Sequence, residues 1–190
     1  MARLLVLLAC FVPVPVANGP GWAASAQEEA DAGNRVYASV EKAPPFQLTD
    51  QHKEAHRIAF PAGKVLFLII ADRKGSDEVE EWIEAVYKRY KDRIGIEGVA
   101  NLDGVPKPLR GVVRGLFKRG VDHPVLLDWD GTVFKNYGCK SGAANVFVVE
   151  RDGTIATRAY GAATEANIDN IASTLDGLLH ASEDGASDAK

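Results

Sequence analysis

Two patterns of apolar residues alternate along the chain after residue 43. Short runs rich in Val, Ile, Leu and Phe predict strands, and apolar residues three and four positions apart predict amphipathic helices. The predicted strands cover residues 46–49, 55–60, 64–71, 94–102, 124–127, 145–150 and 154–160, and the predicted helices cover residues 79–90, 106–120 and 165–179. This order, with a final hairpin and helix, predicts an α/β sandwich.

Local signals indicate how several of these elements are built. The continuous apolar run at residues 64–71 is typical of a central strand buried on both faces. Ser76 is placed to cap the helix that follows it, and Thr164 to cap the last helix. Two prolines open the middle helix, and Arg151-Asp152-Gly153 predicts a hairpin turn. Apolar side chains share one face of the middle helix: Leu109, Val112, Val113, Leu116 and Phe117.

The first 26 residues have the features of an export signal. A basic tip precedes an apolar run over residues 4–17, and Ala24-Ser25-Ala26 forms a cleavage site. The apolar run is too short to cross a bilayer. We therefore predict a cleaved signal peptide over residues 1–26 and a periplasmic or secreted mature protein. An uncleaved membrane anchor and lipoprotein processing at Cys10 are the two alternatives.

The rest of the chain divides into three predicted parts. They are a flexible lead-in over residues 27–43, one domain over residues 44–180 and a disordered tail over residues 181–190. No later apolar run is long enough to cross a membrane, so we expect no transmembrane segment in the mature chain. The 22 basic and 26 acidic residues give a net charge of −4, which argues against a nucleic-acid partner.

Three segments resemble the thioredoxin fold, in particular the redoxin and cytochrome-maturation thioredoxin-like proteins of the bacterial envelope. PFQLTDQHKEAH resembles the N-terminal hairpin of that group, and GKVLFLIIADRKGSDEVEEW resembles its central strand and first helix. HPVLLDWDGTVFKNYGCKSGAANVFVVERDGTI resembles its later strand, YGV turn and hairpin. The resemblance implies a thioredoxin-like sandwich: a central mixed sheet with helices on both faces and an N-terminal β-hairpin extension.

The chain departs from this group at the positions that carry its chemistry. The resemblance places a Cys-x-x-Cys between the central strand and its helix, and here those positions hold Lys74, Gly75, Ser76 and Asp77. Dithiol exchange needs one thiolate to attack and a second thiol to resolve the mixed disulfide. The group's cis-proline corresponds to Ala144, for which we expect a trans peptide bond. The sequence therefore predicts a degenerate dithiol site.

Cys139 is the only cysteine beyond the predicted signal, so it cannot form a disulfide within the mature chain. It takes the place of the hydrophobic residue in the group's YGV turn, which favours a packed thiol. The alternative is a single redox thiol whose pKa is lowered by the neighbouring Lys140. In that case the protein would be a thiol-dependent oxidoreductase of redoxin type.

Two further groups of residues could bind small ligands. His52 and His56 have the spacing of a metal pair, but they fall on a turn and a strand with no cysteine nearby, so we expect solvated histidines and no metal. Residues 73–76 precede a helix N-terminus, where backbone N–H groups attract anions. Acidic residues from Asp77 onward oppose that site, and no cofactor is expected.

The middle helix has a strongly basic face. Residues 107–119 contain no acid, and their candidate partner-binding residues are Lys107, Arg110, Arg114 and Lys118. This face is either simply solvated or a docking surface for an acidic partner or anionic lipid headgroups. We interpret the chain as an exported thioredoxin-fold protein without dithiol activity, acting as a binding or accessory protein of the envelope. The alternative is a single-thiol redox protein that acts through Cys139.

Overall fold

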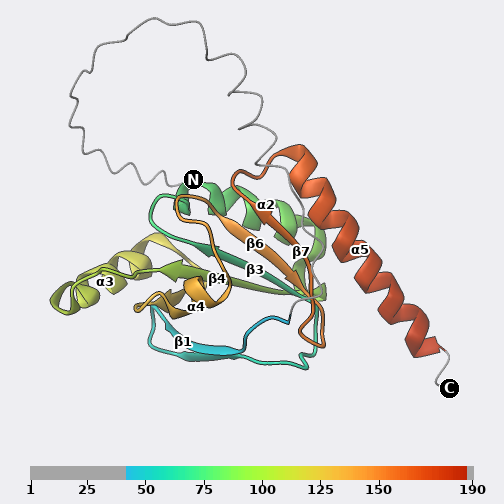
Figure 1. The fold of residues 1–190 in the computed structure, drawn as a ribbon, viewed down its shortest axis with the longest axis horizontal. Coiled ribbons are helices and arrows are strands. Elements are labelled where there is room, and N and C mark those ends of the chain that lie inside the picture. The colour runs from blue at the N-terminus through green and yellow to red at the C-terminus, as the bar shows by residue number, and fades with distance from the viewer. Residues whose placement is uncertain (1–41, 188–190) are drawn as a thin grey trace, which may run out of the picture. The chain divides into compact units, whose positions relative to one another are not determined.

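The computed structural model describes residues 42–187 (Figure 1). The strands are β1 (Phe46–Asp50), β2 (Ala55–Ile58), β3 (Leu66–Ala71), β4 (Gly95–Asn101), β5 (Leu126–Asp128), β6 (Asn145–Val149) and β7 (Ile155–Tyr160). The α-helices are α2 (Val79–Tyr90), α3 (Arg110–Gly120), α4 (Thr132–Asn136) and α5 (Glu165–Ser187). Three short 3-10 helices are η1 (Ser76–Glu78), η2 (Lys91–Arg93) and η3 (Lys107–Leu109).

The strands form one seven-stranded mixed sheet in the order β2-β1-β5-β4-β3-β6-β7 (Figure 1). β3, β4 and β5 pair in parallel, because helical crossovers connect them. β6 pairs antiparallel with both β3 and β7. The β1–β2 hairpin extends the sheet through an antiparallel contact with β5. The predicted mixed sheet with its N-terminal hairpin is confirmed.

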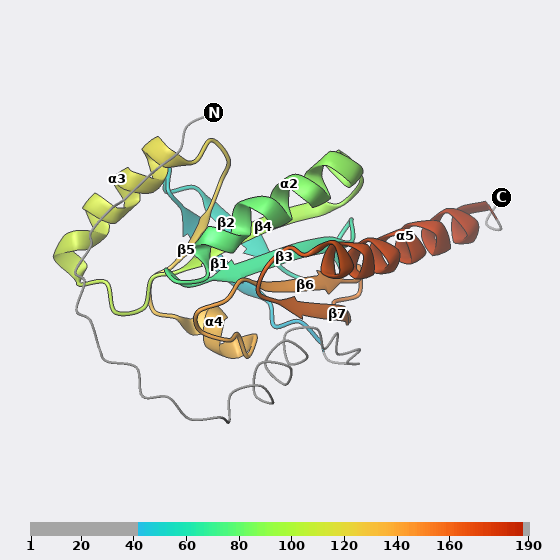
Figure 2. The same ribbon diagram turned by 90° about the horizontal axis from the view of Figure 1, so that it is seen from above.

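The core lies on both faces of β3, all six residues of which are buried. Side chains alternate across a strand, so Phe67 and Ile69 pack with α2 and α5. Leu68 and Ile70 pack on the opposite face with α4 and the β1–β2 hairpin. Figure 2 shows α2 and α4 on opposite sides of the sheet. The predicted placement of helices on both faces is thus confirmed.

Several element boundaries differ from the sequence prediction. Ser76 is not a helix cap; it lies inside η1, and its hydroxyl donates to the Arg73 carbonyl at 2.9 Å. Thr164 does cap α5, because its Oγ1 accepts the Asn167 N–H at 3.3 Å. Helix α5 continues to Ser187, beyond the predicted domain end at residue 180, since extending a formed helix costs little per residue.

Helix α4 was missed by the sequence prediction. Its five residues are too few to show a helical period, and the Asp128 carboxylate holds its first turn. Asp128 Oδ1 accepts the Thr132 N–H and Oδ2 accepts the Phe134 N–H, both at 3.0 Å. A buried carboxylate that receives two helix N–H donors is a strong cap, and it fixes the start of α4 at Thr132, with residues 129–131 between this helix and β5.

The predicted signal peptide and most of the predicted lead-in lie outside the described residues. The last two residues of that lead-in belong to the fold: Ala43 is buried and donates its N–H to the Gly153 carbonyl at 2.7 Å, and Lys42 pairs with Asp152 at 2.7 Å. Within residues 42–187, no helix combines the length and the apolar character needed to cross a membrane.

Candidate functional site

The loop that follows β3 is organised by one carboxylate. Asp72 Oδ1 accepts the N–H groups of Lys74 and Gly75, each at 3.0 Å. These two donors belong to residues 73–76, where the sequence indicated a possible anion site. Because the protein supplies its own carboxylate to these donors, that site is already satisfied. Lys74, Ser76 and Asp77 are exposed on the outer side of the loop.

The same carboxylate ties this loop to the segment before β6. Asp72 Oδ2 accepts the Ser141 hydroxyl at 2.5 Å and the Gly142 N–H at 2.9 Å. Burial would raise the pKa of Asp72, but its hydrogen bonds from Ser141, Gly75, Gly142 and Lys74 outweigh this effect and lower it. Asp72 is therefore a charged hydrogen-bond hub between two loops that are about 70 residues apart in the chain.

A second carboxylate and a close backbone contact complete this junction. Glu78 Oε2 accepts the Ala144 N–H at 2.9 Å. A Cβ on Gly75 would lie 2.3 Å from the Ala143 carbonyl carbon, so the two backbones touch where Gly75 lacks a side chain. Ala144 is fully buried, and its preceding peptide bond is trans. We call the contacts of Asp72, Gly75 and Glu78 with residues 141–144 the loop junction.

Asn145 fixes the far side of the loop junction. Its side-chain nitrogen carries two N–H donors and lies 3.1 Å from the Ile70 carbonyl oxygen, 3.0 Å from that of Lys140 and 2.9 Å from that of Ala143, so one N–H is shared between two carbonyls. Its Oδ1 accepts the Lys140 N–H at 2.6 Å. Asn145 is fully buried, so each of these bonds matters for folding. The sequence analysis assigned Gly75 to the dithiol segment and Ala144 to the cis-proline position. It did not identify Asp72, Glu78 and Asn145 as residues of this site, because their hydrogen-bond partners include residues that are distant in the chain.

Cys139 is a half-buried residue packed against the core on the α4 side of the sheet. Burial raises the pKa of its thiol to about 12, with Arg158 opposing and Asp128 adding to that effect. Lys140, which the sequence offered as the activating cation, instead places its ammonium 4.1 Å from the centre of the Tyr160 ring. The aromatic face thus provides a competing site for the cation that the single-thiol alternative assigned to Cys139.

No family model matches the chain, and no curated protein matches it in sequence. Solved structures match it in fold. The exposed lipoprotein thioredoxin Etrx1 of Streptococcus pneumoniae strain TIGR4 is 21% identical with a TM-score of 0.54, over 71% of this chain and 100% of that one. Peroxidoxin BcpB of Mycobacterium tuberculosis is 18% identical with a TM-score of 0.54, over 74% and 97%. A thioredoxin-family thiol:disulfide interchange protein of Chlorobium tepidum TLS is 17% identical with a TM-score of 0.51, over 75% and 99%.

The chain has a thioredoxin-like fold. This confirms the resemblance inferred from the three sequence segments, at the level of the fold. In a thioredoxin-like fold, the loop after β3 and the start of β6 are the segments that the resemblance assigned to the dithiol and the cis-proline. In this chain those two segments meet at the loop junction, and Cys139 is the free cysteine of the described residues.

The β1–β2 hairpin contains the one group of possible metal ligands identified in the described part of the chain. Ligand atoms of Asp50, Glu54 and His56 lie within 4.8 Å of one another. Asp50 is buried, and its Oδ1 accepts the N–H groups of His52 at 2.8 Å and Glu54 at 2.9 Å. Its Oδ2 pairs with His56 Nε2 at 3.2 Å. The carboxylate thus closes the hairpin turn, and His56 is a partner of Asp50 rather than a solvated residue.

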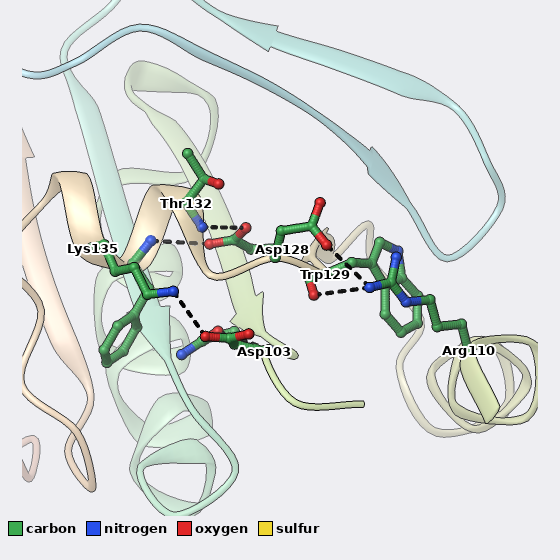
Figure 3. A network of polar contacts seen from close by, with 9 residues as sticks. Asp103, Arg110, Asp128, Trp129, Thr132 and Lys135 are labelled. Atoms are coloured by element: carbon green, nitrogen blue, oxygen red, sulfur yellow. Dashed lines mark hydrogen bonds and ion pairs between the residues drawn. The ribbon is translucent and has the colours of Figure 1, made fainter. Parts of the chain in front are cut away.

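Two arginines of the basic helix α3 contact Trp129, and Figure 3 shows one of them, Arg110, beside that ring. The guanidinium groups of Arg110 and Arg114 lie 5.2 Å and 5.6 Å from the centre of the Trp129 ring. Arg110 also donates to the Trp129 carbonyl at 3.3 Å and pairs with Asp130 at 3.1 Å. Both arginines are half-buried. Of the four predicted partner-binding residues, only Lys107 and Lys118 are exposed.

Proposed function

We propose that this thioredoxin-fold protein has no dithiol activity and acts by binding a partner in the bacterial envelope. The loop junction carries the proposal. In the segment where the resemblance puts a pair of cysteines, the chain has Asp72, Gly75 and Glu78 bound to residues 141–144. These bonds use backbone N–H groups of both loops, so the junction favours a fixed structural contact over an open substrate groove.

The thiol inventory supports the same conclusion. The two cysteines of the sequence are Cys10 and Cys139, which cannot form a Cys-x-x-Cys motif. The pKa of Cys139 is raised to about 12 by burial. At pH 7 a thiol with that pKa is ionised in about one molecule in 10⁵. Since the thiolate is the nucleophile in disulfide exchange, Cys139 is poorly suited to the single-thiol alternative.

Export to the envelope is the second part of the proposal. It rests on the basic tip, the apolar run at residues 4–17 and the small residues at 24–26. One structural neighbour is itself an exposed lipoprotein thioredoxin. N-terminal sequencing of the native protein tests this part, and a retained Met1 in a cytosolic fraction would contradict it.

A disulfide-reduction assay tests the absence of dithiol activity. The full chain should reduce insulin in the presence of dithiothreitol no faster than the buffer, while a dithiol thioredoxin in the same assay gives rapid precipitation. The matched variant is Cys139→Ser, which should behave like the unaltered chain. A rate comparable with that of the thioredoxin would overturn the proposal. A smaller rate that disappears in Cys139→Ser would favour the single-thiol alternative instead.

A further inference from the structure

The outward side of α3 exposes an apolar stripe. Its members are Leu109, Val112 and Leu116, which are 51%, 61% and 55% exposed. Their spacing of three and four residues places them in one row along the helix. The same helix turns Arg110 and Arg114 inward, against Trp129. An amphipathic helix ordinarily buries its apolar side. Here Arg110 and Arg114 lie on the inner side together with the half-buried Val113 and Phe117, while Leu109, Val112 and Leu116 face solvent.

Two glycines lie next to this stripe. Gly111 and Gly115 are inside the helix, where glycine is the least favourable residue apart from proline. A Cβ on Gly111 would meet no atom within 4 Å, and a Cβ on Gly115 would meet only the end of the Arg119 side chain at 4.0 Å. No steric contact within the described chain therefore calls for glycine at either position. One turn apart, the two glycines contribute no side chains to this strip of helix surface, and the end of the Arg119 side chain lies beside Gly115.

Cations border the stripe and the glycines. Lys107, Lys118 and Arg119 are exposed, and residues 107–119 contain no acid. A surface that covers this side of the helix must therefore be apolar at its centre and negatively charged at its edges. We call Leu109, Gly111, Val112, Gly115 and Leu116, with these three cations, the α3 face.

We propose that the α3 face binds an amphipathic helix of a partner protein whose apolar stripe is flanked by Asp and Glu side chains. This inference rests on the proposed binding function and specifies its partner. Anchors at i, i+3 and i+7 are the pattern by which one helix engages another apolar surface. Small residues let two helix backbones approach closely. The partner's carboxylates would pair with the exposed cations at the edges.

Size and composition favour one helix over the other occupants. η3 contains 3 residues and α3 contains 11, whereas a stable interface between globular proteins uses roughly 20–30 residues on each side. A lipid surface attracts Trp, Phe and Leu on the inserted side of an interfacial helix, and glycines contribute nothing to insertion. The two glycines fit a closely packed helix better than a bilayer.

Three synthetic helical peptides of about 20 residues probe the α3 face of the full chain by fluorescence anisotropy. The first has a Leu stripe flanked by Glu, the second has the same stripe flanked by Lys, and the third keeps Glu but has Ser in the stripe. We expect saturable binding of the first peptide only. Val112→Gln, Leu116→Gln and Gly115→Leu should each weaken it at least about tenfold. Tyr87→Gln on α2, where the residue is 57% exposed, is the matched control and should have no effect.

Any of three results would overturn the proposal. The first is that the Leu–Glu peptide does not saturate by about 1 mM, the second is that the Lys peptide binds equally well, and the third is that Gly115→Leu binds the Leu–Glu peptide as tightly as the unaltered chain. Binding to phosphatidylglycerol vesicles that becomes stronger in Gly115→Leu would also overturn it, because a larger side chain favours insertion into lipid but prevents the close approach of a partner helix. Self-association in sedimentation that Leu116→Gln abolishes would assign the α3 face to a second copy of the chain. The insulin assay above is independent of these outcomes, so failure of this inference and failure of the proposed function are distinguishable.

Discussion

Replacing Asp72 with Asn tests whether the loop junction is held by charge. The change keeps the shape of the side chain but replaces one acceptor oxygen with an N–H donor, so two of the four hydrogen bonds at 2.5–3.0 Å face a donor instead. Hydrogen bonds to a charged group are worth roughly 1.5–3 kcal/mol each, and they are not additive at a partly exposed site. We expect Asp72→Asn to lower the free energy of unfolding by about 2–4 kcal/mol.

Urea unfolding, followed by tryptophan fluorescence to which the buried Trp82 contributes, measures this loss. Asp77→Asn, an exposed acid in the same segment, is the matched control and should change stability by less than about 0.5 kcal/mol. A result in which Asp72→Asn is no more destabilising than Asp77→Asn would refute the role assigned to the loop junction.

The pH dependence gives a second check on the same variant. The hydrogen bonds hold the folded-state pKa of Asp72 below its ordinary value of 3.8, so its stabilisation is complete above that value. It is lost as the pH falls from 3.8 through the folded-state pKa, because the protonated carboxyl group resembles the Asn amide. The stability difference between the unaltered chain and Asp72→Asn should therefore shrink on acidification. A difference that stays constant from neutral pH down to acid unfolding would contradict the charge-based explanation.

Substitutions at three further positions have defined outcomes. Cys139→Ser should lower the free energy of unfolding in urea by roughly 1–3 kcal/mol, because it places a hydroxyl in an apolar site. Cys139→Val should leave this free energy nearly unchanged. A thiol reagent should label Cys139 slowly in the native protein, and fast labelling would contradict burial. Gly75→Ala should cost about 2 kcal/mol or more, since its Cβ would lie 2.3 Å from the Ala143 carbonyl carbon, and unchanged stability would show that the loops can separate freely. Asp128→Ala should cost about 1–2 kcal/mol through the lost cap of α4, and an unchanged urea midpoint would show that the cap is dispensable.

Local pattern determined most of the secondary structure. The run of residues 64–71 indicated a strand buried on both faces, and all six residues of β3 are buried. The helical spacing of apolar residues located α2, whose Trp82, Val86 and Tyr90 are buried. These elements can be predicted from the sequence because a continuous apolar run and a helical spacing both depend only on residues close together in the chain. α4 escaped prediction because its cap, not its periodicity, defines it.

The loop junction could not be predicted from the sequence, because its contacts join residues that are far apart in the chain. Asp72 and Glu78 reach partners 70 and 66 residues away, and only the packing of β3 beside β6 brings them within hydrogen-bond distance. From the sequence, the acidic residues near the start of α2 were assigned to the helix dipole. In the fold, Glu78 binds the Ala144 N–H instead, because a buried donor without a partner costs more than an exposed helix terminus does.

For α3, the sequence and the tertiary structure determine different things. The sequence by itself predicted a helix over residues 106–120 with an apolar face and a basic face, and the structure has η3 followed by α3 there. Which side of the helix faces the protein was decided by the tertiary structure, in which the Trp129 ring lies where Arg110 and Arg114 can stack on it and Asp130 can pair with Arg110. Periodicity distributes side chains around a helix axis, but it carries no information about rotation on that axis. Rotation depends on the contacts that each side of the helix makes in the assembled fold, and the inner side of α3 places Arg110 and Arg114 on Trp129. Val113 and Phe117, which are also half-buried, lie next to these arginines at helical spacing.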